Sequence, residues 1–213
     1  MKKVALKGLT TGLILQVAIG PVFLFLMNIT LQKTLMDGFS AVLAVTIVDY
    51  LYIILAIVGI GKLLEKEKVK RLLGIFSSIV LILFGIYILI NSFDRINGNR
   101  IISVQSSNLY QSFITTFVLT ISSPLTIVFW SSIFAARSLE YSLSKKELIV
   151  FGFSAGFATP LFLSLSIVIV SLLKTSIPAL VFQLANIIIG VLLIGYGMKR
   201  LIASRVAKRT ETK

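Results

Sequence analysis

Residues 39–61 read FSAVLAVTIVDYLYIILAIVGIG, an apolar stretch that carries one charged residue, Asp49. About 20 apolar residues are enough for a helix to cross the roughly 30 Å hydrocarbon core of a bilayer. No Lys or Arg accompanies Asp49 within this stretch. The stretch therefore predicts a membrane-spanning helix with a carboxylate near its middle and no basic partner beside it.

The rest of the chain has the same apolar character. Hydrophobic residues make up 57% of the 213 residues, charged residues only 14%, and the mean hydropathy is +1.00. A soluble domain carries about 25% charged residues. We therefore predict an all-α polytopic membrane protein, with one six-helix domain over residues 1–203 and a basic cytoplasmic tail over residues 204–213. The expected spans are residues 4–29, 39–61, 72–92, 110–136, 149–173 and 178–202.

Lys and Arg are unevenly distributed between the expected spans. Of the 21 basic residues, 17 lie at the two termini and in the second and fourth loops, which leaves Lys33, Arg95, Arg100 and Lys174 for the other loops. Basic loops stay on the cytoplasmic side of a membrane. We therefore predict a multi-pass protein of the cytoplasmic (inner) cell membrane with both termini in the cytoplasm. This topology explains the net charge of +13, and the expected partner is a lipid bilayer rather than nucleic acid.

The chemistry open to the chain is limited, because it contains no Cys and no His. Disulfides, thiolate chemistry, histidine proton relays and His-built metal sites are therefore excluded. The sequence also has no carboxylate pair and no nucleophile–base pair of the kind that enzymes use. We expect no enzymatic activity, no cofactor and no metal site.

Short motifs recur in the same order in the two halves of the chain. Gly20-Pro21 and Ser123-Pro124 lie in the first expected helix of each half. Gly38-Phe39-Ser40-Ala41 and Gly152-Phe153-Ser154-Ala155 begin the second. A repeat with an odd number of helices must be inserted with inverted topology. We therefore predict two inverted repeats of three transmembrane helices.

Asp49 is the residue that points most strongly to a function. A carboxylate at the bilayer centre costs about 2.5–3.5 kcal/mol on insertion scales. Burial also favours the protonated form of a carboxyl group. Asp49 is therefore expected to be protonated much of the time, to face a wet cavity, or to pair with a transported cation. Such a residue suits a proton-coupled carrier better than a purely structural role.

Prolines interrupt three of the expected helices, at Gly20-Pro21, Ser123-Pro124 and Pro160. Proline removes a backbone hydrogen bond, and irregular backbone persists in a membrane only where protein or water satisfies it. Paired breaks in matching helices indicate a binding site near the midplane. Kinks that serve only packing are the alternative, above all at Pro160. The predicted helix-break or gating residues are Pro21, Pro124 and Pro160.

Small and polar residues recur at four-residue spacing, as at Gly8, Gly12, Gln16 and Gly20 in the first helix. Residues so spaced share a helix face, which serves close packing or lines a cavity. Trp130 and Tyr141, by contrast, look like anchors at the membrane interface. The candidate residues for binding substrate or proton are Asp49, Gln16, Gly20, Pro21, Thr46, Thr120, Ser123 and Pro124.

Four motifs resemble the LysE/RhtB family of amino-acid exporters, within the LysE superfamily. They are Ile19-Gly20-Pro21, Asp49, Gly85-Ile86-Tyr87 and Ser123-Pro124-Leu125. The resemblance covers nearly the whole chain and is closer to the lysine-exporter branch. It implies six hydrophobic segments and export driven by the proton gradient. The fourth motif departs from the family's usual Asn-Pro-Lys, since Ser and Leu flank the proline here.

We therefore expect a secondary active transporter that exports an amino acid or a related small solute in exchange for protons. One alternative keeps the fold and changes the cargo to a metal ion or another cation. An alternative of another class is a membrane assembly or partner protein without transport activity. The expected partners are a small-molecule solute, protons and the bilayer, and self-association into a homo-oligomer stays open.

Overall fold

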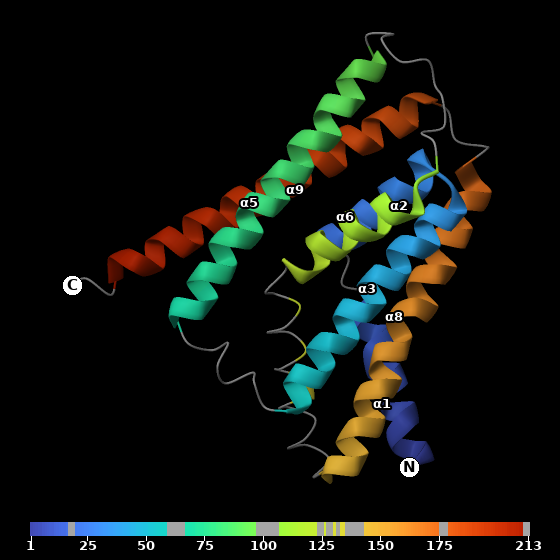
Figure 1. Ribbon diagram of the computed structural model, residues 1–213, viewed down its shortest axis with the longest axis vertical. Coiled ribbons are helices and arrows are strands. Elements are labelled where there is room, and N and C mark those ends of the chain that lie inside the picture. Colours follow the sequence, from blue (N-terminus) through green and yellow to red (C-terminus); the bar gives the residue numbers. More distant parts are fainter. Residues whose placement is uncertain are drawn as a thin grey trace.

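The computed structural model describes residues 1–16, 20–58, 67–96, 107–122, 126, 130, 133–134, 143–174 and 179–210. Within these residues every regular element is helical, as the apolar sequence predicts (Figure 1). The helices are α1 (Lys2–Gln16), α2 (Pro21–Gln32), α3 (Leu35–Ile57), α5 (Glu67–Ile96), α6 (Leu109–Ile121), α8 (Lys145–Leu173) and α9 (Ala179–Thr210).

By length and composition, α3 and α8 can each cross a membrane. The pair α1 and α2 makes a third candidate span, broken between the two helices, whose directions differ by 76°. Two shorter apolar helical stretches, Gly74–Ile90 and Gln183–Lys199, fall inside expected spans, and a third, Leu109–Ile121, begins one residue before the expected span 110–136. The described residues therefore confirm the all-helical class and contain two or three candidate spans, while the number six stays a prediction.

The exposed face of α3 is apolar. Leu43, Ile47, Leu51 and Ile54 follow one another at helical spacing and are 41–55% exposed. Side chains three and four positions apart share a helix face. Asp49 lies on the other side of the helix and is only 5% exposed, so its carboxylate faces the protein interior.

Glycines on α1 let it pack directly against α8. A Cβ atom on Gly8 would lie 2.4 Å from the Phe151 carbonyl oxygen, and one on Gly12 would lie 2.3 Å from that of Ala155. The contacts advance by four residues on both helices, so α1 and α8 run in the same direction. Close approach of backbones through small residues is a common way for membrane helices to associate.

Helix α8 packs on its other side against α3, which runs in the opposite direction (Figure 1). A Cβ atom on Gly152 would meet Ile53 and Ile57, whereas one on Gly156 would meet Tyr50 and Ile53. As the residue number rises on α8, it falls on α3, which is the signature of an antiparallel pair. Helix α8 thus lies between α1 and α3, and its contacts fix the position of each of these helices along its axis.

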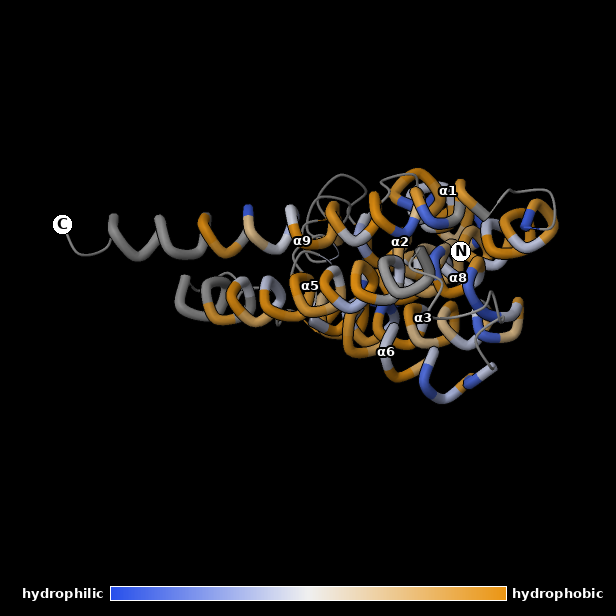
Figure 2. Tube along the Cα trace, turned by 90° about the horizontal axis from the view of Figure 1, so that it is seen from above, coloured by the Kyte–Doolittle hydropathy of each residue, from blue (hydrophilic) through white to orange (hydrophobic). Residues whose placement is uncertain are grey.

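Helices α5 and α9 form a separate antiparallel pair. Gly85 of α5 packs on the Gly190 carbonyl oxygen, and Gly197 of α9 packs on that of Ser78. Seen from above, parts of both helices extend away from the other helices (Figure 2). Helix α9 continues to Thr210, so most of the expected tail, residues 204–213, is part of this helix.

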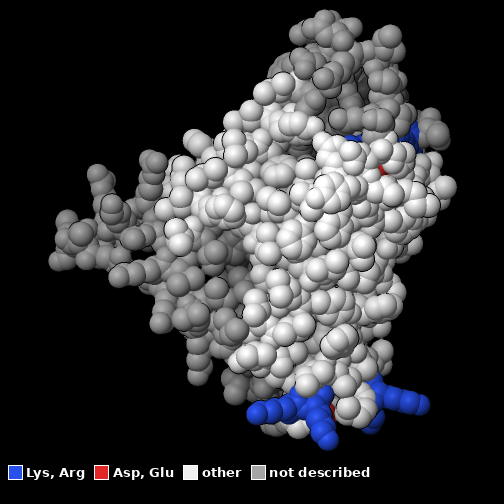
Figure 3. Space-filling view, viewed as in Figure 1, with Lys and Arg blue, Asp and Glu red and all other residues white. Residues whose placement is uncertain are grey.

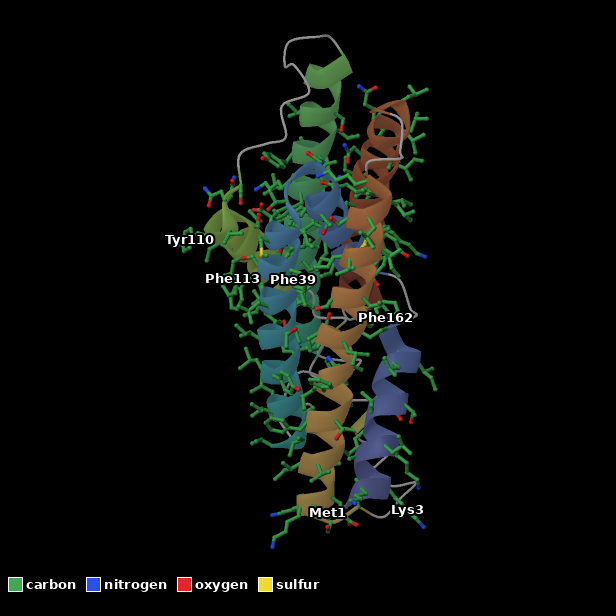
Figure 4. The ribbon with its side chains drawn as sticks, turned by 90° about the vertical axis from the view of Figure 1, so that its right-hand side faces the viewer. Met1, Lys3, Phe39, Tyr110, Phe113 and Phe162 are labelled. Atoms are coloured by element: carbon green, nitrogen blue, oxygen red, sulfur yellow. The ribbon has the colours of Figure 1, made fainter. Side chains whose placement is uncertain are left out.

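Charged side chains gather at two opposite ends of the described surface, with an uncharged band between them (Figure 3). Met1 and Lys3 lie at one end, whereas Phe39, Tyr110 and Phe113 lie toward the other (Figure 4). This distribution suits a molecule whose middle contacts hydrocarbon and whose ends contact water.

Candidate functional site

Asp49 lies between two apolar clusters that share α3 and α8. One cluster contains Val42 and Val45 of α3 together with Leu163 of α8. The other contains Val48 and Tyr52 of α3 together with Phe151 and Ala155 of α8, and includes Trp130. On α8, Thr159 lies between the residues of the two clusters. On α3, Asp49 lies between Val48 and Tyr52 of the second cluster, one turn beyond Val45 of the first. The result is a polar layer enclosed above and below by packed hydrophobic side chains.

Four side chains are connected by hydrogen bonds in this layer. Thr159 Oγ1 donates to Asp49 Oδ2 over 2.7 Å, and Gln16 Nε2 donates to Thr159 Oγ1 over 2.6 Å. Trp130 Nε1 donates to Asp49 Oδ1 over 3.4 Å. Both donors to the carboxylate are neutral groups, so the carboxylate is held by hydrogen bonds and not by an ion pair with either of them. Such an arrangement leaves Asp49 free to exchange a proton or to bind a cation.

Packing of α1 on α8 positions Gln16. Gly8 contacts Phe151 and Gly12 contacts the Ala155 carbonyl oxygen, and one further turn brings Gln16 to Thr159. Gln16 is also the last residue of α1, directly before the break in the first expected span. The side chain at the helix end therefore reaches the polar layer.

The depth of Asp49 follows from the starts of α3 and α8. Both helices begin with a capping box, formed by Thr34 and Asp37 in α3 and by Ser144 and Glu147 in α8. Asp49 and Thr159 each lie fifteen residues after the N-cap of their helix. At 1.5 Å per residue this is roughly 22 Å from each end. Because the two helices are antiparallel, Asp49 lies about midway between two ends roughly 45 Å apart, which matches the thickness of a bilayer with its headgroups.

The break expected at Gly20-Pro21 is present. Helix α1 ends at Gln16, Gly20 is the extended N-cap of α2, and Pro21 is the first residue of α2. Proline suits this position because its missing N–H has no partner in the first turn of a helix. Apart from its two chain neighbours, no residue that the structure describes has an atom within 4 Å of a Cβ placed on Gly20.

Two of the sequence expectations are wrong. Pro160 does not interrupt its helix, because α8 runs without a break from Lys145 to Leu173. Its ring costs one backbone hydrogen bond, and packing against α1 and α3 holds the helix together on both sides of it. Trp130 is no interface anchor either: it is 2% exposed and donates to Asp49. The prediction followed from its position near one end of the expected span 110–136, whereas the N–H of a buried Trp ring usually finds an acceptor in the interior.

The hydroxyls of two other candidates bond within their own helices, and further candidates lie outside the described residues. The Thr46 hydroxyl donates to the Val42 carbonyl oxygen of its own helix over 2.8 Å. The Thr120 hydroxyl likewise donates to Thr116 over 2.7 Å. Ser123, Pro124 and Tyr141 lie outside the described residues. The structure thus brings Asp49 and Gln16 together and adds Thr159 and Trp130, which the sequence analysis did not assign to the site.

A second polar cluster, which the sequence analysis missed, joins α3 and α6 near the start of α3. The Asp37 carboxylate accepts hydrogen bonds from Ser112 Oγ over 2.8 Å and from the Asn108 backbone over 3.1 Å. Lys33 Nζ lies 3.2 Å from Ser112 Oγ. Burial lowers the pKa of Lys33, whereas the Asp37 charge opposes that shift. The same two causes act on the pKa of Lys174, whose ammonium group donates to the carbonyl oxygens of Thr30 and Lys33.

The fold and the polar layer define a class of protein, an α-helical membrane protein built around a buried carboxylate between two apolar clusters. The model of the LysE type translocator family matches residues 13–204, so the chain belongs to this family. It is therefore a multi-pass membrane transporter, an exporter of amino acids or related small solutes, and not an enzyme. Comparison with curated proteins and with solved structures finds no significant match.

Proposed function

We propose that the protein exports its solute across the cytoplasmic membrane in exchange for protons, with Asp49 as the carboxylate that binds them in turn. The observation that carries the proposal is the position of Asp49, buried to 5% exposure and bonded to neutral Thr159 and Trp130. An ionised carboxylate without a cation is costly in such a place. Binding of a proton or of a cationic solute group offsets that cost, so occupancy by one favours release of the other.

The two apolar clusters support an alternating-access mechanism. Each cluster closes one side of the polar layer, and both clusters are packed in this structure. Loosening of one cluster at a time would connect Asp49 with one side of the membrane and then the other. Such a movement needs only small shifts of α3 relative to α8, since both clusters include residues of each helix.

The break before α2 supplies a second binding element. The N-terminus of a helix carries a partial positive charge, and no described residue beyond its chain neighbours lies within 4 Å of a Cβ placed on Gly20 at this end. A solute carboxylate would be attracted to this end, whereas an ammonium group would be attracted to Asp49. This pair of attractions suits a zwitterionic amino acid.

Helix packing supports the proposed inverted halves of three spans each. The first half holds α1 with α2, α3 and α5, and the second holds α6, α8 and α9. If the two halves are equivalent, α1 corresponds to α6 and α3 corresponds to α8. The contact between α1 and α8 then corresponds to the contact between α6 and α3, and both contacts are present. The same correspondence leaves the α3–α8 and α5–α9 contacts unchanged, and these are also present. This is the contact pattern of two halves related by a twofold axis in the membrane plane.

The alternative of a metal-ion exporter with the same fold lacks a group of metal ligands among the described residues. Within them, no three His, Cys, Asp or Glu side chains are grouped where they could hold a metal ion. The proposal therefore keeps an amino acid or a related small solute as the cargo.

The test is counterflow in proteoliposomes driven by a pH difference, with a solute first chosen by growth rescue on overexpression. We expect Asp49→Asn to abolish pH-driven counterflow while the melting temperature in detergent stays close to that of the unchanged protein. Glu147→Gln, which alters an acidic residue at the exposed start of α8, serves as the control and should transport normally. Unchanged pH-driven counterflow in Asp49→Asn would refute the proposed role of Asp49.

A further inference from the structure

A cavity with polar walls lies where the end of α2 meets α5 and α6. Its volume is about 50 Å³, and its polar lining consists of Asn28, Gln32, Lys33, Gln111 and Thr115. Phe84 and Tyr87 of α5 form part of its apolar wall. Lys33 directly precedes the N-cap of α3, so the cavity lies more than roughly 20 Å along α3 from Asp49. It is therefore separate from the polar layer around Asp49.

Lys33 gives this cavity a positive charge. The residue is only 8% exposed, and Nζ makes long contacts of 3.2 Å to Ser112 Oγ and 3.4 Å to Gln111 Oε1. The Asp37 carboxylate accepts its hydrogen bonds from other groups. One oxygen accepts from Thr34, and the other accepts from Ser112 and the Asn108 backbone. Lys174 adds a second positive charge near Asp37. Of the described residues that line the cavity, Lys33 is the one with a charged side chain, so the charge at the cavity wall is positive.

A buried amide cluster holds the other wall in place. Asn28 Nδ2 donates to Asn186 Oδ1 of α9, and Gln32 Nε2 donates to Asn28 Oδ1 over 2.6 Å and to Asn186 Oδ1 over 3.1 Å. Asn28 and Asn186 are 4% and 2% exposed. These bonds fix the side chains of Asn28 and Gln32 beside the cavity, so its shape does not depend on a ligand.

We propose that this cavity is a second station for the solute and binds its carboxylate group at the Lys33 ammonium. This inference rests on the proposed export function and adds a site on the α2–α6 side of the Asp49 layer. A cavity of about 10–15 Å³ holds one water molecule, so about 50 Å³ holds a group of a few heavy atoms. A carboxylate with its α-carbon has this size. A buried ammonium with long hydrogen bonds gains most from an anionic partner.

Cysteine labelling tests the charge of the cavity, because the chain has no Cys of its own. Thr115→Cys places a thiol in the lining, and the lost hydroxyl bonds only backbone carbonyls of its own helix. We expect anionic sulfonatoethyl methanethiosulfonate to react about tenfold faster than the cationic trimethylammonium reagent, since a charged cleft concentrates the opposite ion. Lys33→Gln should bring the ratio close to one. Lys174→Gln, which alters a cation outside the lining, should keep most of the preference.

Protection identifies the ligand group. Sodium acetate and glycine should slow the labelling of Thr115→Cys, whereas glycinamide and sodium chloride at the same concentration should not. Tyr110→Cys, at a side chain 76% exposed on the same helix, should be labelled at rates that neither acetate nor Lys33→Gln changes. Equal protection by sodium chloride or glycinamide, or a reagent preference that survives Lys33→Gln, would overturn the proposal.

These results are independent of the test of Asp49. Labelling requires no proton gradient, so the reagent ratio and the protection should be the same in the Asp49→Asn background. Transport that survives Asp49→Asn refutes the proposed coupling and leaves the cavity result standing. A reagent preference that Lys33→Gln leaves unchanged, in variants that melt normally, refutes the cavity proposal alone.

Discussion

Thr159 Oγ1 donates a 2.7 Å hydrogen bond to Asp49 Oδ2, and each of the two residues lies fifteen positions after the N-cap of its own helix. The bond therefore marks the point where two antiparallel helices of matching design cross. One half of the chain contributes the acid, and the other contributes the hydroxyl that orients it. A shift of either helix relative to the other would therefore alter the hydrogen bond between Thr159 and Asp49.

The first prediction concerns this bond. Thr159→Val keeps the side-chain shape but removes the donor to Asp49, and a hydrogen bond to a charged group contributes about 1.5–3 kcal/mol. We expect transport to fall by roughly ten- to a hundredfold. Thr159→Ser keeps the hydroxyl and should retain most of the rate. Initial rates of counterflow in proteoliposomes measure both variants, and equal rates for Val and Ser would show that the bond has no part in transport.

The second prediction concerns the contact between α1 and α8. In Gly12→Ala the new methyl group would lie 2.3 Å from the Ala155 carbonyl oxygen, so the helices must move apart. Overpacking of this kind costs about 1–3 kcal/mol. Gly195→Ala is the matched control, because a Cβ atom there meets no atom of the described residues within 4 Å. The better helix former should stabilise α9 by up to about 1 kcal/mol. Unfolding in detergent measures both, and a Gly12→Ala variant as stable as Gly195→Ala would contradict the packing of α1 on α8.

The third prediction compares the two capping boxes. Asp37 is fully buried, caps α3, and balances Lys33 and Lys174, so Asp37→Ala should lower the free energy of unfolding by about 3 kcal/mol. Glu147→Ala removes the equivalent acid from the exposed capping box of α8 and should have a clearly smaller effect. Denaturation curves of the purified variants decide the matter. Equal losses would mean that Asp37 acts only as a cap and not on the two lysines.

The fourth prediction concerns the proposed topology. Ser107 precedes α6, whereas Lys146 lies in the first turn of α8, and both side chains are exposed. With both termini in the cytoplasm, Ser107→Cys should react with a membrane-impermeant maleimide in intact spheroplasts. Lys146→Cys should react only after permeabilisation. Labelling of both variants in intact spheroplasts, or of Lys146→Cys alone, would exclude the proposed orientation.

Several features were predictable because they depend on one helix at a time. The apolar run around Asp49 is long enough to span a bilayer, and its one charge stands out in any window. The break at Gly20-Pro21 follows from the covalent structure of proline. The two capping boxes could also have been predicted, because each consists of a Ser or Thr followed three residues later by an acidic residue. These pairs are Thr34 with Asp37 and Ser144 with Glu147. All of these signals arise within a few residues of chain.

The sequence by itself thus determined a membrane-embedded helical protein, the acid at its centre and the place where its first span breaks. Only the tertiary structure decided that Thr159 and Trp130 bind Asp49 and that Pro160 leaves its helix intact. It also decided that Lys33 and Asn28 line a cavity at the end of α2. The physical reason is that a single helix defines its own faces but not its height relative to a neighbour. That height depends on how small residues interlock, as Gly8 and Gly12 do with α8, and on the alignment of partners more than a hundred residues apart.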